Sequence, residues 1–124
     1  MSAKIIRRSS VASKKNSKAL AQRLAQELRD KKAAQITILD LRRTSPITDF
    51  FVITTGLSDI HLKNLANHLI ETERPHHVEG FNSAGWILLD YFDVVVHVFL
   101  ENIREFYGLE RLWGDAPVIR IADD

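Results

Sequence analysis

Histidines and paired carboxylates are the side chains whose types could support metal binding or catalysis in this 124-residue chain. His61 and His68 are seven positions apart on one predicted helix, which is too far for a shared metal ion. His97 alternates with Val96 and Val98 in an apolar run, a pattern typical of a histidine inside a strand. The lack of cysteine excludes zinc fingers, iron–sulfur clusters and thiol nucleophiles. The sequence therefore predicts neither a metal site nor a cofactor.

One segment is similar to the beginning of an enzyme site. Residues 56–58 (GLS) are similar to the Gly-Ser start of nucleotidyltransferases, which also need two aspartates one residue apart on a strand to hold magnesium. Here Asp90 and Asp93 are three positions apart across a predicted turn, and no nucleophile elbow for a Ser-His-Asp triad is present. The sequence therefore favours a protein without catalytic activity, with nucleotidyl transfer as the less favoured alternative.

A binding surface is the better supported hypothesis. Trp86 begins a predicted strand, and residues 90–93 (DYFD) form a predicted hairpin turn that exposes aromatic rings beside carboxylates. Strand alternation places Trp86, Leu88 and Asp90 on one face. Aromatic residues ringed by charge are typical of protein interfaces. The alternative, in which Trp86 and Tyr91 fill the core beneath helices, stays open on the residues alone.

The net charge of +1 combines two opposed halves. Residues 1–32 carry ten basic and two acidic side chains, whereas residues 33–124 carry seven basic and fourteen acidic ones, a net −7. An acidic body repels nucleic-acid phosphates and attracts basic protein surfaces, although composition alone favours the simpler interpretation that the carboxylates keep the domain soluble. Residues 1–15 are basic and Ser-rich, which indicates a disordered arm. This arm could be a bacterial tail, an organellar transit peptide or a segment that contacts phosphate.

Hydrophobic periodicity predicts the elements that must position these residues. Residues 16–116 form the predicted domain, and residues 117–124 an extended tail. Leu112 and Trp113 are expected to pack back on the core, and no apolar run is long enough to cross a membrane. The order of elements indicates an α/β (α+β) layered fold with a mixed sheet of about five strands, and not a doubly wound fold. Helices are predicted over 16–32, 58–71 and 101–107, and strands over 35–41, 50–55, near Val78, 86–89 and 94–100.

Several blocks of sequence, taken in order, resemble the Iojap-related ribosomal silencing factors. The resemblance extends from about Leu20 to Ala116. It rests on residues 48–58 (TDFFVITTGLS), Glu79-Gly80, 86–91 (WILLDY), Asp93, 96–99 (VHVF), Arg104, Tyr107, Leu109-Glu110 and Leu112-Trp113.

The resemblance implies a fold and a function. The fold is a mixed sheet with flanking helices, similar to nucleotidyltransferases without their catalytic aspartates. The implied function is to bind the large ribosomal subunit through its basic protein number fourteen and to block joining of the small subunit. Trp86 and Tyr91 are the implied apolar anchors, Asp90 and Asp93 the acceptors for Arg or Lys, and Glu79 and His97 their neighbours. An assembly factor that rides the large subunit without blocking joining is the alternative.

Further expectations concern partners and compartment. The basic arm could contact ribosomal RNA, a homodimer is left open, and no membrane partner is expected. The expected compartment is the cytoplasm, with a mitochondrion or plastid as the alternative. One departure from the family pattern stands out: the turn Asp-Tyr-Gly-Asp has Phe92 in place of the glycine. If that position needs a positive φ, a phenylalanine there is strained.

Overall fold

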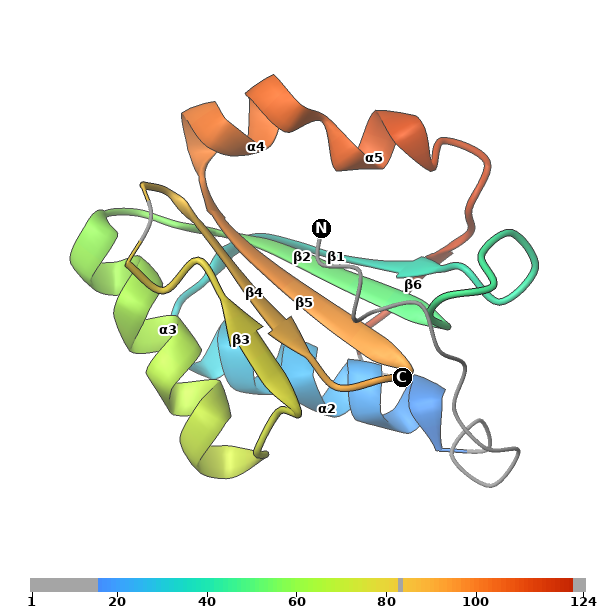
Figure 1. Ribbon diagram of the computed structural model, residues 1–124, viewed down its shortest axis with the longest axis horizontal. Helices are drawn as coiled ribbons and strands as arrows, with labels where there is room; N and C mark the ends of the chain where they lie inside the picture. Colours follow the sequence, from blue (N-terminus) through green and yellow to red (C-terminus); the bar gives the residue numbers. More distant parts are fainter. Residues whose placement is uncertain (1–15, 83, 122–124) are drawn as a thin grey trace.

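The computed structural model describes residues 16–82 and 84–121, which form two layers of helices around one sheet (Figure 1). The predicted arm, residues 1–15, lies outside the described residues. Most predicted elements are confirmed within a residue or two of their expected bounds. In chain order the elements are α2 (Ser17–Asp30), β1 (Ala34–Asp40), β2 (Phe50–Gly56), α3 (Asp59–Thr72), β3 (His77–Glu79), β4 (Trp86–Asp90), β5 (Val94–Leu100), α4 (Glu101–Tyr107), α5 (Leu109–Leu112) and β6 (Val118–Ile119). Of these, α5 and β6 were not predicted as a helix and a strand.

The six strands form one mixed sheet in the order β3-β4-β5-β2-β1-β6. β2 and β5 are parallel neighbours at its centre, and every other pairing is antiparallel. β2 is buried along its whole length, as its apolar sequence predicts. The sheet has one strand more than expected, because Val118 and Ile119 of the extended C-terminal segment pair with β1.

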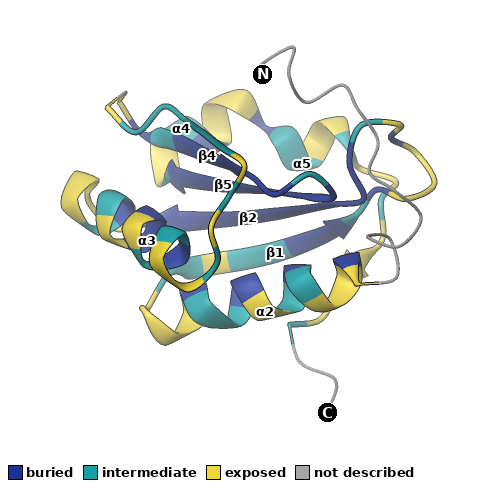
Figure 2. Cartoon of the chain, turned by 60° about the horizontal axis from the view of Figure 1, so that its bottom comes forward, coloured by how far each residue is buried: buried dark blue, intermediate teal, exposed yellow. Residues whose placement is uncertain are grey.

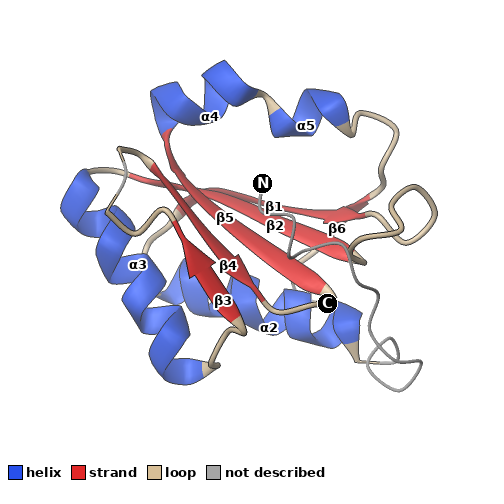
Figure 3. Cartoon of the chain, in the orientation of Figure 1, coloured by secondary structure: helices blue, strands red, loops and turns tan. Residues whose placement is uncertain are grey.

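The two faces of the sheet are covered by different helices (Figure 3). α2 and α3 cover one face with the apolar stripes expected from their sequences, and the residues they bury there are dark in Figure 2. Ser58 caps α3, since its hydroxyl accepts a hydrogen bond from the His61 N–H at 3.1 Å. α4 and α5 cover the opposite face. The mixed sheet between helical layers confirms the predicted fold class.

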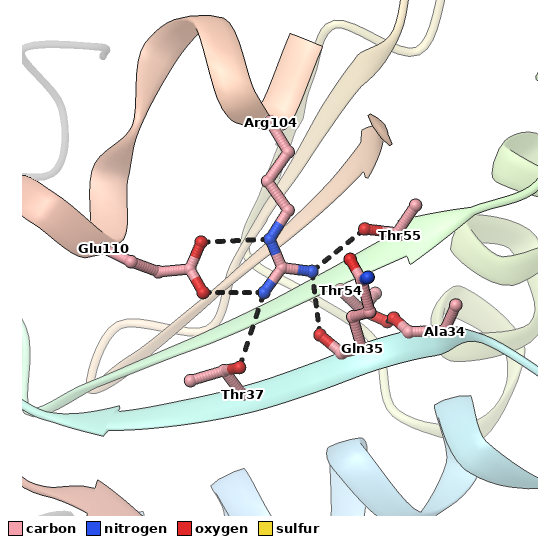
Figure 4. Close-up of polar contacts among 7 residues, drawn as sticks. All are labelled: Ala34, Gln35, Thr37, Thr54, Thr55, Arg104 and Glu110. Atoms are coloured by element: carbon pink, nitrogen blue, oxygen red, sulfur yellow. Dashed lines mark hydrogen bonds and ion pairs between the residues drawn. The ribbon is translucent and has the colours of Figure 1, made fainter. Parts of the chain in front are cut away.

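Gly108 separates the short helices α4 and α5, and Arg104 links them to each other and to the sheet. Gly108 has φ +56°, a left-handed conformation that ends α4 and lets the chain bend before α5 begins. Across this bend Glu110 meets Arg104, whose Nε and Nη2 donate to the two carboxylate oxygens at 3.0 and 2.8 Å (Figure 4). These hydrogen bonds hold the pKa of Glu110 below its ordinary value.

The same guanidinium also reaches the sheet. Its Nη1 donates to the Gln35 carbonyl at 2.7 Å and to the Thr55 hydroxyl at 2.9 Å, and its Nη2 lies 3.4 Å from the Thr37 hydroxyl (Figure 4). Arg104 is buried, so these are bonds in a partly desolvated environment. One side chain thus joins α4, α5, β1 and β2.

One packing expectation at the end of α5 is half wrong. Trp113 does pack on the sheet, with its ring 6.1 Å from that of Phe51 in an edge arrangement. Leu112, in contrast, is 73% exposed. In so short a helix only one side can face the sheet, and Leu109 and Trp113 occupy that side.

Replacing Arg104 by methionine is expected to lower the free energy of unfolding by about 3 kcal/mol. The aliphatic volume is largely kept, but the Gln35 carbonyl and the Thr55 hydroxyl lose their donor. Urea unfolding followed by circular dichroism measures the loss. The matched control is Arg111→Met on exposed α5, where a change of no more than about 0.5 kcal/mol is expected. Equal losses in the two variants would contradict the bridging role of Arg104.

Candidate functional site

The turn between β4 and β5 is buried, so the expectation of an exposed aromatic tip is wrong. Tyr91 is only 6% exposed and packs with the residues of α2 and α3. Its hydroxyl donates to the Glu73 carbonyl at 2.8 Å, just past the end of α3. Burial raises the pKa of this phenol. Tyr91 faces the helices because residues 87, 89 and 91 alternate toward the α2–α3 face.

The two carboxylates of the turn also lie inside. Asp90 and Asp93 are 1% and 4% exposed. The Asp90 carboxylate accepts a hydrogen bond from the Phe92 N–H at 2.8 Å, and the Asp93 carbonyl accepts from the N–H of Asp49 and of Phe50. The Asp90 carboxylate and the Asp93 backbone carbonyl therefore stabilise the turn, and neither carboxylate presents the exposed acceptor that was expected.

Phe92 adopts the backbone conformation that its position in the family pattern suggested. Its φ is +71°, in the left-handed region that favours glycine. The side chain lies against His76, with ring centroids 3.8 Å apart in an edge arrangement. The turn therefore keeps a shape suited to glycine although a phenylalanine occupies it.

Trp86 stands on the opposite face of the sheet, in a groove of about 290 Å³. β4 supplies Trp86 and Leu88 from the face that alternation predicted for them, and α4 supplies Ile103 and Tyr107 across the groove. Glu79, at the end of edge strand β3, lies on the rim together with Gly80 and Ala84. Of the six expected site residues, this groove collects Trp86 and Glu79.

Aromatic rings surround the indole of Trp86. Its ring centroid lies 4.8 Å from that of Phe99 and 4.7 Å from that of Tyr107. Tyr107 is 49% exposed and touches the exposed Phe106, so the aromatic surface continues outward along α4. Trp86 itself is half-buried. Tryptophan and tyrosine are enriched among the residues that dominate binding at protein interfaces.

His97 lies beneath Trp86 and is completely buried. The Trp86 indole N–H donates to His97 Nδ1 at 3.1 Å. Phe51 packs edge-on against the imidazole from β2, with centroids 4.5 Å apart. Burial lowers the pKa of His97 to about 3, so the ring is neutral at physiological pH. His97 cannot touch a partner directly, which corrects its expected place among surface neighbours.

The folded part of the chain is less acidic than the count for residues 33–124 implied. Residues 16–121 carry twelve basic and fourteen acidic side chains, because α2 belongs to the folded body and brings its basic residues with it. The −7 expected for the body is therefore wrong. Near the groove the balance is still acidic: Glu79 pairs with His77 at 3.0 Å on β3, and residues 101–115 carry four carboxylates against two arginines.

A second groove, of about 570 Å³, opens where the parallel strands β2 and β5 end. Asp59, Glu101 and Glu105 line it together with Gly56 and Ser58. The carboxyl ends of parallel strands are a common place for ligands in α/β proteins. Within residues 16–82 and 84–121, however, no group of three His, Asp or Glu side chains is arranged to hold a metal ion. Over the same ranges no helix is long and apolar enough for a membrane span.

Sequence analysis assigned no role to three residues that form or support the groove: Ile103, Tyr107 and Arg104. Ile103 and Tyr107 are four positions apart, so they lie on one face of α4 and together form a wall of the groove. That spacing was visible in the sequence. The contact of this helix face with β4 was not, because it depends on how α4 lies across the sheet.

Comparison with known proteins gives consistent matches. The family model described as "Ribosomal silencing factor during starvation" matches residues 14–124. A "Ribosomal silencing factor RsfS" of Halalkalibacterium halodurans is 42% identical over 100 residues, covering 74% of this chain and 83% of that protein. Its namesake in Bacillus subtilis is 38% identical over 108 residues, covering 83% and 92%.

More distant relatives and solved structures agree with these matches. "Mitochondrial assembly of ribosomal large subunit protein 1" of Mus musculus is 31% identical over 94 residues, covering 69% of this chain and 41% of that protein. A crystal structure of a Chromobacterium violaceum protein matches with a TM-score of 0.70 at 35% identity, over 77% of this chain and 85% of that one. A structure from Bacillus halodurans also has a TM-score of 0.70, at 34% identity, over 83% and 98%.

Tyr91→Phe is expected to lower the free energy of unfolding by about 1 kcal/mol, because the Glu73 carbonyl loses its buried donor. Tyr107→Phe, at the half-exposed tyrosine of α4, is the matched control and should change it by less than about 0.5 kcal/mol. Urea unfolding at neutral pH compares the two. If Tyr91→Phe proved as neutral as the control, the burial of the turn would be contradicted.

The buried His97 makes stability depend on pH in a defined window. Its folded pKa is about 3, whereas an unfolded histidine titrates near ~6.5. Below about pH 6.5 the unfolded chain binds a proton that the folded chain does not, so stability falls as the pH falls toward 3, by up to about 1.4 kcal/mol per unit. His97→Leu should remove this contribution. Unfolding of both proteins between pH 7.5 and 4.5 should therefore show a difference in stability that grows with acidity, and a constant difference would contradict it.

Proposed function

The chain belongs to the ribosomal silencing factor family, and from this premise we propose that it binds the large ribosomal subunit through its basic protein number fourteen. Bound there, the protein occupies the face on which the small subunit docks, and so prevents the two subunits from joining. Translation stops because no complete ribosome forms. This activity needs shape and affinity but no chemical step, so the proposal is of a regulator without catalysis.

The observation that carries the proposed contact is the groove containing Trp86. Half-buried Trp86 and Tyr107 offer aromatic faces to a partner, and Glu79 offers a carboxylate at the rim. This combination fits a basic side chain, because a cation over an aromatic face can at the same time pair with the carboxylate. We assign Trp86 as the central anchor and Glu79 as the acceptor.

The other expected contact residues act from inside the domain in this proposal. Tyr91, Asp90 and Asp93 fix the turn at the far end of β4, and His97 supports the indole from below. Because they are buried, their replacement should change stability, or the shape of the groove, and not the contact itself. The acidic residues of α4 and α5 would speed the encounter with a basic protein.

A second candidate is a role in assembly of the large subunit. It is favoured by the name of the mouse relative, a mitochondrial protein of large-subunit assembly that is 31% identical. An assembly factor shares the same binding partner but need not hinder subunit joining.

Contact of the arm with ribosomal RNA and a homodimer remain predictions. The protein is expected in the compartment of its ribosome: the cytoplasm in a bacterium, or a mitochondrion or plastid.

Subunit joining distinguishes silencing from assembly. Purified large and small subunits mixed with the protein should give less joined ribosome on a sucrose gradient, with the protein in the large-subunit fraction. Trp86→Ala should bind the large subunit about thirtyfold more weakly, which corresponds to about 2 kcal/mol for a central aromatic anchor. The inhibition of joining should weaken in parallel.

The matched control is Leu112→Ala, which removes an exposed apolar side chain from α5. Binding of the control should be unchanged. Protein that sediments with the large subunit while joining proceeds normally would replace silencing by the assembly role. Unaltered binding of a folded Trp86→Ala variant would overturn the assignment of the groove.

A further inference from the structure

We propose that His97 is a positioning residue, whose role is to hold the Trp86 indole in the orientation that forms the wall of the groove. The proposal rests on the function proposed above, because it explains how the binding groove is kept in shape. It assigns His97 no contact with the partner.

The place of His97 in the sheet is unfavourable for a polar side chain. β5 is a central strand that pairs with β2 on one side and β4 on the other. Its other residues from Val94 to Phe99 are buried and apolar, and His97 itself is 0% exposed. A valine or leucine would suit this position on packing grounds alone. The imidazole therefore needs an explanation other than core packing.

The hydrogen bond from Trp86 defines the state of the ring. Because the indole N–H can only donate, Nδ1 must be the acceptor, and the proton of the neutral imidazole must be on Nε2. No acceptor for this Nε2–H is found among residues 16–82 and 84–121. A buried donor without an acceptor destabilises a fold. The imidazole thus makes the core less stable, but it supplies a buried acceptor for the indole N–H.

The aromatic contacts of Trp86 do not give the same control. Phe99 and Tyr107 lie 4.8 and 4.7 Å from the indole at tilts of 32° and 50°, contacts that tolerate rotation of the ring. A hydrogen bond of 3.1 Å to one atom is directional and selects one rotamer. Tyr107 is half-exposed, whereas His97 is completely buried on β5, which pairs with β2 and β4. The hydrogen bond to buried His97 therefore sets the orientation of the Trp86 indole in the groove.

A double-mutant cycle between the two residues tests the proposal. Trp86→Phe keeps an aromatic ring but removes the donor, and His97→Leu removes the acceptor. Each single variant should bind the purified large subunit about fivefold more weakly, whereas the double variant should be no weaker than Trp86→Phe alone. If the two single losses of affinity multiplied in the double variant, His97 would not act through the indole. This result would overturn the proposal.

Comparing stability with affinity distinguishes the positioning role from a merely structural one. If His97 only stabilised the fold, variants that lose stability would also lose affinity. His97→Leu should be at least as stable as the natural chain at pH 7 and yet bind less well. His97→Asn, whose side-chain oxygen can replace Nδ1 as acceptor, should be less stable but bind better than His97→Leu. Affinity that follows stability across these variants would contradict the positioning role.

Nuclear magnetic resonance of the isolated protein keeps this test independent of the ribosome. With ¹⁵N-labelled tryptophan, the Trp86 indole N–H should exchange with solvent at least about tenfold faster in His97→Leu, because its buried acceptor is gone. The Trp113 indole in the same spectrum is the internal control. Unchanged exchange at Trp86 would overturn the positioning role. If the natural chain failed to bind the large subunit, the proposed function would fall, and the exchange experiment would still decide the role of His97.

Discussion

The hydrogen bonds of the Arg104 guanidinium are the interaction on which the groove face of the sheet depends. The guanidinium is the buried link between the short helices α4 and α5 and the two strands β1 and β2 (Figure 4). Helices of seven and four residues have little stability of their own, so they need such a tertiary bond to stay in place. Ile103 and Tyr107 flank Arg104 in α4 and form one wall of the groove. The position of that wall is thus set by a charge buried on the sheet.

The opposite wall is set by the sheet itself. The antiparallel pairing of β4 with β5 aligns Trp86 with Phe99 and Leu88 with His97, so the indole lies above a polar atom of the neighbouring strand. On the other face the same two strands present apolar residues to α2 and α3. One face of β4 therefore serves the stability of the fold, and the other builds the groove. Tyr91 follows Ile87 and Leu89 on the face that packs on the helices, so it lies in the core. Trp86 lies on the opposite face and reaches the surface.

Most of the secondary structure could be predicted from the sequence, because the periodicity of apolar residues reflects which side of each element is buried. The positive φ at Phe92 could also be anticipated from the glycine that the family has there. The exposure of the β4–β5 turn was predicted wrongly, since alternation tells which residues share a face but not whether a helix covers that face. The charge of the body was also wrong, because composition cannot separate the basic helix α2 from the arm before it. Tyr107 was missed as a site residue for a similar reason: its neighbours come from a distant strand.

The edges of the sheet have a consequence for how copies of the chain can associate. Within the part of the chain that the structure describes, the outermost strands are short: β3 has three residues and β6 has two, so each offers only a short row of backbone donors and acceptors. Strand-to-strand stacking of molecules into fibrils is thereby discouraged, although the central strands are strongly apolar. Association of two copies through these outermost strands would therefore join only short stretches of backbone.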